Sequence, residues 1–412
     1  MLSYSLIIFC ITLLINPILC YIPETRIGHN SVIIHNQLLV FGGWKMETNT
    51  STYEMFYLDL TKPFDSKNQS WDLIREGNLP VYTYYSAAVA DTLDDDIIYL
   101  IGGYRINITT NENDYSNVVY MYNYSNTKWT APKVDNAPPR QEIMGTIDNK
   151  GIVYIFGGNN MTNFTMGRLY NDMQIFNVTT MIWSKLSIIH NLPSPSCAYT
   201  ATMMTNGIIV YLGGVEVVNE NYTSRLESNY LSMKTIRLFD TLKSEWSQMN
   251  VTGGDDIAPR VYHTSVLTTD GYIILFGGVG RNNTPVSTKL AILDTNKDIY
   301  EWTIPSSSDS SPHLYAHTAN LYGNYMIVTF GRDTDNKDLN SQIYLFDVTH
   351  YTWVTTYTPP PIITKSSSKA LAIGLGVGGG IFLVILVSIG VTFFKRHRHT
   401  PILKISGSDS II

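Results

Sequence analysis

The stretch Leu38-Leu39-Val40-Phe41-Gly42-Gly43 decides the fold, because it recurs along the chain. An apolar run typical of a strand ends in two glycines, which let the backbone pass where a side chain would clash. The first glycines of successive copies are separated by 60, 55, 56, 64 and 54 residues, counting Gly331 in the sixth copy, Phe330-Gly331-Arg332. The five complete pairs are Gly42/Gly43, Gly102/Gly103, Gly157/Gly158, Gly213/Gly214 and Gly277/Gly278.

Each copy is followed by an alternating strand and then by a single tryptophan that opens a fourth strand. The chain has seven tryptophans, and six occupy this position: Trp71, Trp129, Trp183, Trp246, Trp302 and Trp353. A four-stranded sheet with two apolar faces must be covered on both sides, and a ring of such sheets achieves this. We expect each tryptophan to fill the gap between two neighbouring sheets.

This repeat resembles the kelch repeat, which has a period of about 50 residues. The resemblance covers Arg26 to about Thr356 and implies a six-bladed all-β propeller with four antiparallel strands per blade. The layout also resembles kelch-repeat membrane proteins of fungi. How the ring closes stays open: it lacks a strand swapped between its ends, or it uses residues 21–25.

The resemblance also implies that each blade begins at a turn containing Arg and, three residues later, His. Arg26-Ile27-Gly28-His29 and Arg260-Val261-Tyr262-His263 match it, and Arg140 and His317 match it in part. We align Tyr85 and Tyr199 with the histidine in the second and fourth blades. These histidines are expected to be structural hydrogen-bond partners and not ligands.

Two apolar segments flank the repeats. Residues 1–20 are interpreted as a signal peptide, with an uncleaved anchor as the alternative because no Lys or Arg precedes the apolar run. Residues 370–394 carry no charge over 25 positions and are followed by a basic cluster, which predicts a transmembrane helix with a cytoplasmic tail at 395–412. We therefore expect a type I cell-membrane protein with an extracellular propeller at 21–356 and a Pro/Ser stalk at 357–369. The spacings Gly374/Gly378 and Gly376/Gly380 suggest a homodimer through this helix.

Ten sequons lie between the two apolar segments, as expected for a glycoprotein. They are Asn49, Asn68, Asn107, Asn123, Asn160, Asn163, Asn177, Asn221, Asn250 and Asn282. Cys197 is the one cysteine outside the leader, so no disulfide framework is predicted. The 28 Lys and Arg residues against 34 Asp and Glu residues give a net charge of −6, which argues against a nucleic-acid partner.

Long loops between the second and third strands emerge on one face of a four-stranded blade, and such loops commonly carry binding sites. Each contains a basic residue: Lys45, Arg105, Arg168, Arg225, Arg281 and Arg332. These six residues are our candidate ligand-binding set, as a basic rim for an acidic ligand. The alternative is scattered surface charge, with acidic neighbours such as Glu47 and Glu216.

We expect a non-enzymatic module that binds an extracellular protein or glycan, with no cofactor and no catalytic residue. A third interpretation is an adhesion or polarity scaffold that acts through helix pairing. The alternative function is a membrane-tethered oxidase of the galactose oxidase type, which is also built on a kelch propeller. That resemblance implies copper held by two His and two Tyr, with one Tyr cross-linked to a Cys. Cys197 and the pair His313/His317 are the nearest candidates, although we expect Cys197 to be a buried apolar residue.

Overall fold

The structure is a computed structural model that describes residues 21–45, 48–160, 167–217, 228–308 and 310–360. Its regular elements are β-strands, together with two short 3-10 turns, η2 (Arg281–Asn283) and η3 (Ser306–Ser308). The predicted all-β class is therefore confirmed. No helix within the described ranges is long and apolar enough to span a membrane. The predicted leader (1–20) and span (370–394) lie outside those ranges.

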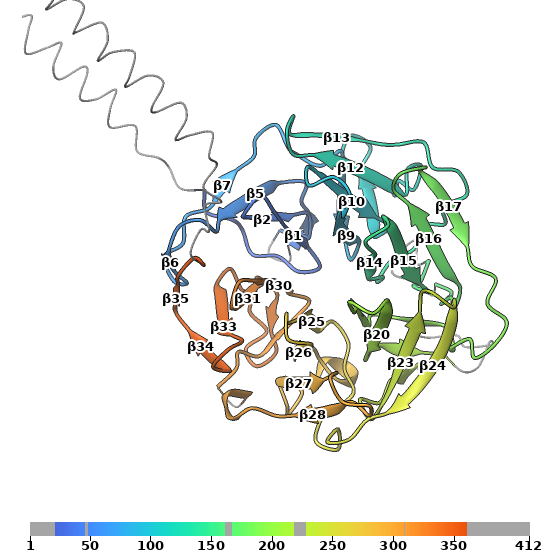
Figure 1. The fold of residues 1–412 in the computed structure, drawn as a ribbon. Coiled ribbons are helices and arrows are strands. Elements are labelled where there is room, and N and C mark those ends of the chain that lie inside the picture. Colours follow the sequence, from blue (N-terminus) through green and yellow to red (C-terminus); the bar gives the residue numbers. More distant parts are fainter. Residues whose placement is uncertain (1–20, 46–47, 161–166, 218–227, 309, 361–412) are drawn as a thin grey trace, which may run out of the picture. The chain divides into compact units, whose positions relative to one another are not determined.

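Six antiparallel sheets of four strands follow one another along the chain, and Figure 1 shows them arranged around a centre. The first sheet has β1 (Asn30–Ile34), β2 (Gln37–Phe41), β5 (Met55–Asp59) and β7 (Asp72–Leu73), and the second has β9 (Ala87–Ala90), β10 (Ile97–Ile101), β12 (Val119–Asn123) and β13 (Lys128–Thr130). The third sheet has β14 (Gly145–Ile147), β15 (Ile152–Phe156), β16 (Met173–Asn177) and β17 (Ile182–Lys185), and the fourth has β19 (Thr200–Met203), β20 (Ile208–Leu212), β23 (Thr235–Asp240) and β24 (Glu245–Asn250). The fifth sheet has β25 (Thr264–Leu267), β26 (Tyr272–Phe276), β27 (Leu290–Asp294) and β28 (Glu301–Thr303), and the sixth has β30 (Thr318–Tyr322), β31 (Tyr325–Thr329), β33 (Ile343–Asp347) and β34 (Thr352–Val354). The first strands of the sheets contact one another in a closed cycle, β1 to β9, β14, β19, β25, β30 and back to β1.

Alternation along the second strand of each sheet builds the core between sheets. In β2, Leu38 and Val40 pack toward the sixth sheet, whereas Leu39 and Phe41 pack toward the second. Successive side chains of a strand point to opposite faces, so a fully apolar strand serves two interfaces at once. Six buried clusters of this kind join the six pairs of neighbouring sheets.

Each of these six clusters contains one of the repeat tryptophans. Trp246 of the fourth sheet, for example, lies 4.6 Å from Phe156 of the third sheet, measured between ring centroids. Trp353 of the sixth sheet lies 5.1 Å from Phe276 of the fifth. Trp302 donates its indole N–H to the Met233 carbonyl of the fourth sheet. The tryptophans therefore tie each sheet to the one before it.

The second glycine of each pair makes a backbone bond to the next sheet. Its N–H donates to a carbonyl that precedes the next first strand, over 2.7–3.0 Å in all six cases: Gly43 to Thr83, Gly103 to Arg140, Gly158 to Ser196, Gly214 to Arg260, Gly278 to Leu314 and Gly331 to Arg26. In the second copy, a Cβ on the first glycine, Gly102, would lie 2.3 Å from the Arg140 carbonyl oxygen. This close approach explains the glycine pair.

The sixth copy is aligned one residue differently from our sequence alignment. Gly331 has φ +94 and donates to the next sheet, as the second glycines do, so it is not the counterpart of the first glycines. The first-glycine position is held by Phe330, with φ +54. Its buried ring packs between the sixth and first sheets, close to Trp71 and Phe56.

Ring closure uses the C-terminal end of the repeats. β35 (Thr356–Tyr357) pairs with β6 (Phe64–Asp65), which lies between the third and fourth strands of the first sheet. Tyr357 is fully buried and its hydroxyl donates to the Leu60 carbonyl, so the first residue of the predicted stalk packs against the first sheet. Tyr21 bridges Trp71 within that same first sheet.

Candidate functional site

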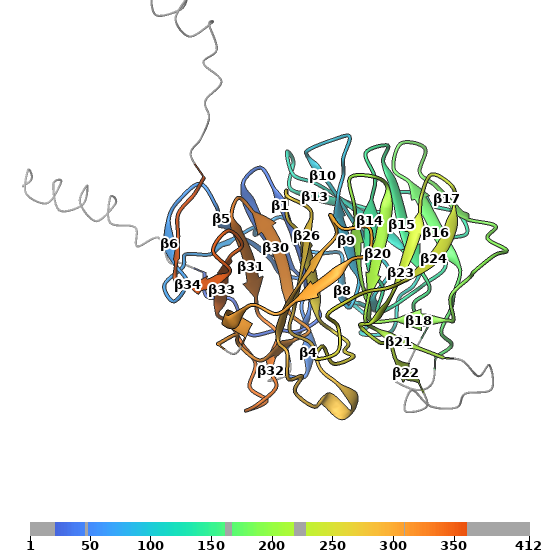
Figure 2. The same cartoon turned by 60° about the horizontal axis from the view of Figure 1, so that its bottom comes forward.

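One face of the ring carries a second layer of short sheets, seen along the lower edge of Figure 2. They are β3 (Trp44–Lys45) with β4 (Thr50–Ser51), β8 (Val81–Tyr84) with β11 (Tyr104–Asn107), β18 (Ser196–Cys197) with β21 (Val215–Glu216) and β22 (Asn229–Tyr230), and β29 (Leu314–Tyr315) with β32 (Arg332–Asp333). Three of them connect the segment entering a sheet with the loop after its second strand, as β18 and β21 do, whereas β3 and β4 both lie in the loop after β2. We call this side of the ring the loop face.

A ring of six equivalent residues surrounds the central cavity on the loop face. These mouth positions are Gly28, Tyr85, Glu142, Ala198, Tyr262 and Ala316, all with φ between +52 and +59. Each follows a residue that is bridged to the residue after the glycine pair: Ile27–Trp44, Tyr84–Tyr104, Gln141–Asn159, Cys197–Val215, Val261–Val279 and Tyr315–Arg332.

The mouth positions are joined by backbone hydrogen bonds around the ring. In each of the following pairs the N–H of the first residue donates to the carbonyl of the second, over 2.8–3.1 Å: Tyr85 to Gly28, Glu142 to Tyr85, Ala198 to Glu142, Ala316 to Tyr262 and Gly28 to Ala316. Five of the six N–H groups, all but that of Tyr262, thus donate to the mouth carbonyl of the preceding sheet. These bonds link the entering segments of neighbouring sheets around most of the mouth.

Two tyrosines and a glutamate supply the large side chains of the mouth. The rings of Tyr85 and Tyr262, from the second and fifth sheets, lie 5.1 Å apart between centroids. The Glu142 side chain is buried, and its Oε1 accepts a 2.6 Å hydrogen bond from the Tyr262 hydroxyl. Its Oε2 accepts from Asn159 Nδ2 at 2.9 Å and from the Cys197 thiol at 3.1 Å. Three donors from three sheets therefore orient one carboxylate at the mouth.

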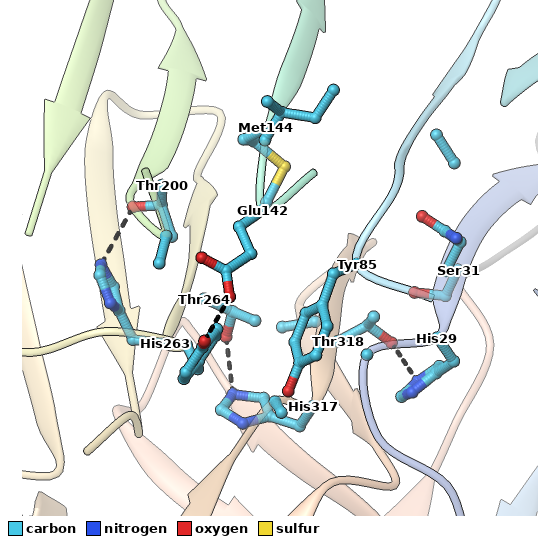
Figure 3. A pocket seen from close by; sticks show the side chains of 18 of the residues that line it. His29, Ser31, Tyr85, Glu142, Met144, Thr200, His263, Thr264, His317 and Thr318 are labelled. Atoms are coloured by element: carbon cyan, nitrogen blue, oxygen red, sulfur yellow. Dashed lines mark hydrogen bonds between the residues drawn. The ribbon is translucent and has the colours of Figure 1, made fainter. Parts of the chain in front are cut away.

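The cavity at the mouth has a volume of about 270 Å³ and is lined by the first strands of five sheets and, in the third sheet, by residues 142–144 just before β14. His29, His263 and His317 lie in its wall (Figure 3), and each ring contacts a threonine hydroxyl of the preceding sheet, Thr318, Thr200 or Thr264. Burial lowers the pKa of His263 and of His317 to about 3, and that of His29 well below its usual value. The histidines are therefore neutral and act as structural hydrogen-bond partners between sheets.

The alignment of the second blade with this histidine position was wrong by one residue. The second glycine of each pair packs against the side chain at this position, and Gly103 packs against Ser86 as Gly43 does against His29. Ser86 is thus the counterpart of the histidines, and Tyr85 is a mouth residue. Tyr199 does hold the histidine position in the fourth blade, against Gly214.

The predicted basic set does not come together as one rim. Arg105 is fully buried, with Nε bonded to the Gly102 carbonyl and Nη2 to the Val118 carbonyl, so its guanidinium does not reach the surface. Lys45 is mostly buried in ion pairs with Glu24 and Glu54.

The other members of the set differ in exposure. Arg168 and Arg281 are exposed, beside Tyr170 and Tyr230 respectively. Arg332 bonds the Lys337 carbonyl and the Tyr315 hydroxyl. Arg225 lies outside the described residues.

The sequons vary in exposure. Asn49, Asn68, Asn250 and Asn282 are exposed, whereas Asn107, Asn123, Asn160 and Asn177 are half-buried. Asn163 and Asn221 lie outside the described residues.

The side chains named for copper do not converge. His317 contacts Thr264, whereas His313 pairs with Asp335 at 2.8 Å and contacts Lys289. The Cys197 thiol points at Glu142, not at a phenol ring carbon. These residues do not fit a copper-radical centre. Within the described ranges, no group of three or more His, Cys, Asp or Glu is placed to hold a metal ion.

Comparison with known proteins gives the family. Residues 16–214 and 223–386 match the model of the KLHDC2/KLHL20/DRC7 Kelch-repeats domain. The chain belongs to the kelch-repeat family. This kelch chain is 25% identical over 342 residues to Kelch domain-containing protein 1 of Mus musculus, covering 76% of the chain and 77% of that protein. It is 23% identical over 262 residues to Kelch domain-containing protein 3 of Rattus norvegicus, covering 61% of the chain and 64% of that protein.

Other relatives are longer. The chain is 22% identical over 343 residues to Acyl-CoA-binding domain-containing protein 5 of Arabidopsis thaliana, covering 80% of the chain but 47% of that protein. It thus spans about half the length of such plant relatives. The solved structure of YjhT superposes with a TM-score of 0.58 at 13% identity, over 81% of this chain and 97% of that one. That likeness supports the kelch propeller fold alone.

Sequence reasoning missed the mouth residues Tyr85, Glu142 and Tyr262. The one available signal was their place in the turn that enters each blade: Glu142 and Tyr262 each stand two residues after the arginine of that turn, Arg140 and Arg260 respectively. Because the position is also occupied by Gly and Ala, no residue type marks it.

Proposed function

We propose that this kelch chain is a six-bladed, non-enzymatic interaction module that binds a protein partner with the loop face, around the central mouth. Membership of the kelch family supports an interaction role. The proposal commits to a protein ligand and places its contact at the mouth and the short sheets around it.

The observation that carries the proposal is the conformation of Tyr85, Glu142 and Tyr262. A left-handed backbone costs a residue with a Cβ about 1–2 kcal/mol, whereas glycine adopts it freely. Gly28 shows that the mouth geometry forms with no side chain at all. Large side chains stand at three such positions and all line one cavity, which favours a role in binding because strained residues gather at functional sites; the buried Phe330 shows that the same backbone also occurs in the core.

We further propose the cellular setting that the sequence predicts. In this proposal residues 1–20 are a signal peptide, residues 370–394 anchor the chain in the cell membrane, and the propeller faces outward. The uncharged segment with its basic flank and the sequons between the two apolar segments support it. Glycosidase treatment of the full chain tests the orientation: a mass shift from occupied sequons is expected. An unchanged mass together with a protease-accessible tail outside the cell would contradict it.

Site-specific photo-cross-linking on the full chain tests the interaction face. A photoreactive residue replaces Arg281, which is exposed on the loop face, or Leu242, which is 74% exposed in the hairpin between β23 and β24. Hairpins joining third and fourth strands emerge on the side opposite the loop face, so Leu242 is a matched control. We expect a discrete protein adduct from position 281 that is missing from position 242. Equal adducts from both, or adducts from neither, would overturn the proposal.

A further inference from the structure

The mouth has a charge opposite to that expected of a basic rim. Glu142 is the one carboxylate among the described residues that line the central cavity, and no Lys or Arg lines it. The histidines in the wall are neutral because burial lowers their pKa far below physiological pH. When ionised, Glu142 gives the lining one negative charge, and its burial strengthens electrostatic attraction relative to water.

The two tyrosine rings that stand with Glu142 at the mouth also attract positive charge. The faces of Tyr85 and Tyr262 carry the negative part of the ring quadrupole, which attracts a cation placed within about 6 Å of the ring centre. Tyr262 also donates to Glu142 Oε1, so ring and carboxylate act on the same point of the mouth. Aromatic rings that line a cavity hold organic cations in other proteins.

A planar cation fits this mouth better than a point charge. The rings of Tyr85 and Tyr262, tilted by 35° to one another, are half-buried and line the cavity, and the planar guanidinium group stacks on aromatic faces more readily than the compact ammonium group. Within this chain, Arg140 lies over the Tyr170 ring at 3.4 Å and Arg105 over Tyr120 at 4.9 Å, which shows the same pairing in its interior.

From this geometry we infer that the mouth formed by Tyr85, Glu142 and Tyr262 receives an arginine side chain of the protein partner. The inference rests on the proposed function and names the chemistry of the group that the loop face recognises. Arginine is also enriched among the residues that dominate binding at protein interfaces. In this inference the guanidinium stacks on a tyrosine at the mouth and pairs with the carboxylate of Glu142 beside it.

Ligand-observed NMR on the full chain in neutral detergent tests the inference directly. The probes are the Nα-acetyl methylamides of arginine, lysine and citrulline, the last being the uncharged analogue of arginine. We expect saturation transfer to the arginine probe, weaker transfer to the lysine probe and none to citrulline. Equal transfer to arginine and citrulline would overturn the inference.

Two substitutions locate the site. Glu142→Gln keeps the size of the side chain and removes its charge, and we expect it to weaken arginine binding roughly tenfold, as the loss of about 1.4 kcal/mol would. Tyr262→Phe keeps the ring and should retain most of the binding. Unchanged binding by Glu142→Gln, with an unchanged melting temperature, would refute the assignment. If Glu142→Gln fails to fold, the comparison of arginine with citrulline on the unsubstituted chain still decides.

The cross-linking experiment separates the two proposals. Adducts at position 281 that persist in the Glu142→Gln chain would retain the loop face as the binding face and reject arginine recognition at the mouth. Loss of those adducts in a folded Glu142→Gln chain is the result that we expect. No adduct in either chain would reject the proposed function itself.

Discussion

Replacing Phe330 by alanine and by glycine tests how the sixth sheet closes the ring on the first. Phe330 occupies the position at which five other sheets have glycine, in the left-handed conformation with φ +54. Its side chain is 1% exposed and lies 5.2–6.0 Å from the rings of His29, Phe56 and Trp71. The residue thus combines an unfavourable backbone with favourable packing, and the two substitutions separate these effects.

The magnitudes follow from burial and backbone strain. Truncating a buried phenylalanine to alanine costs about 3–5 kcal/mol of unfolding free energy. Glycine loses the same packing but relieves about 1–2 kcal/mol of left-handed strain. It also gives up about 0.4–1 kcal/mol because the unfolded chain becomes more flexible. We therefore expect Phe330→Gly to be more stable than Phe330→Ala by about 0.8 kcal/mol, within a range of roughly 0–1.6 kcal/mol on the same figures.

Urea unfolding of the full chain, followed by tryptophan fluorescence, measures both variants. The tryptophans lie between sheets, so their emission reports the loss of the ring. Phe346 in β33 is the matched control, because it is fully buried in the same sheet on ordinary strand backbone. There alanine should be the more stable, as glycine weakens a strand. The same order of stability at positions 330 and 346 would refute the left-handed assignment of Phe330.

Three other predictions concern the core. Trp246→Ala should lower the unfolding free energy by about 3–5 kcal/mol, because Trp246 is buried. Trp129→Ala should lower it by less, because Trp129 is half-buried, and urea midpoints measure both changes. The pKa of His263 and of His317 falls to about 3 on folding, whereas an unfolded histidine titrates near 6.5, so the unfolded chain binds more protons between these values. The contribution of these histidines to the unfolding free energy is therefore fully present above about pH 6.5 and is lost toward pH 3, by up to about 1.4 kcal/mol per pH unit for each histidine. Urea midpoints measured across this pH range should fall less steeply for His317→Gln than for the unsubstituted chain. The buried thiol of Cys197 should react with a thiol reagent only in denaturant, and mass spectrometry of its peptide should show an unmodified cysteine; a cross-linked tyrosine there would instead revive the oxidase alternative.

The repeat made the framework predictable from the sequence. Glycine pairs and tryptophans recur because the close approach of Gly102 to the Arg140 carbonyl and the packing of Trp246 against Phe156 each allow few residue types. The sixth copy was misaligned because Phe330 replaces a glycine, and a left-handed phenylalanine leaves no mark in a sequence. The burial of Arg105 could not be predicted from the sequence either. A long loop predicts an exposed side chain, but the Arg105 guanidinium turns inward and bonds backbone carbonyls.

The mouth was unpredictable for a different reason, and that reason bears on function. Backbone bonds join five neighbouring pairs of its six positions, and these positions accept Gly, Ala, Tyr and Glu, so no single residue type marks them. Gly28 and the two alanines at Ala198 and Ala316 leave three sides of the mouth small, while the second, third and fifth sheets place two tyrosines and a buried carboxylate there. Whatever distinguishes this kelch chain from another with the same framework has to lie where the framework permits variation. The side chains of Tyr85, Glu142 and Tyr262 are therefore the part of the ring in which partner specificity is to be sought.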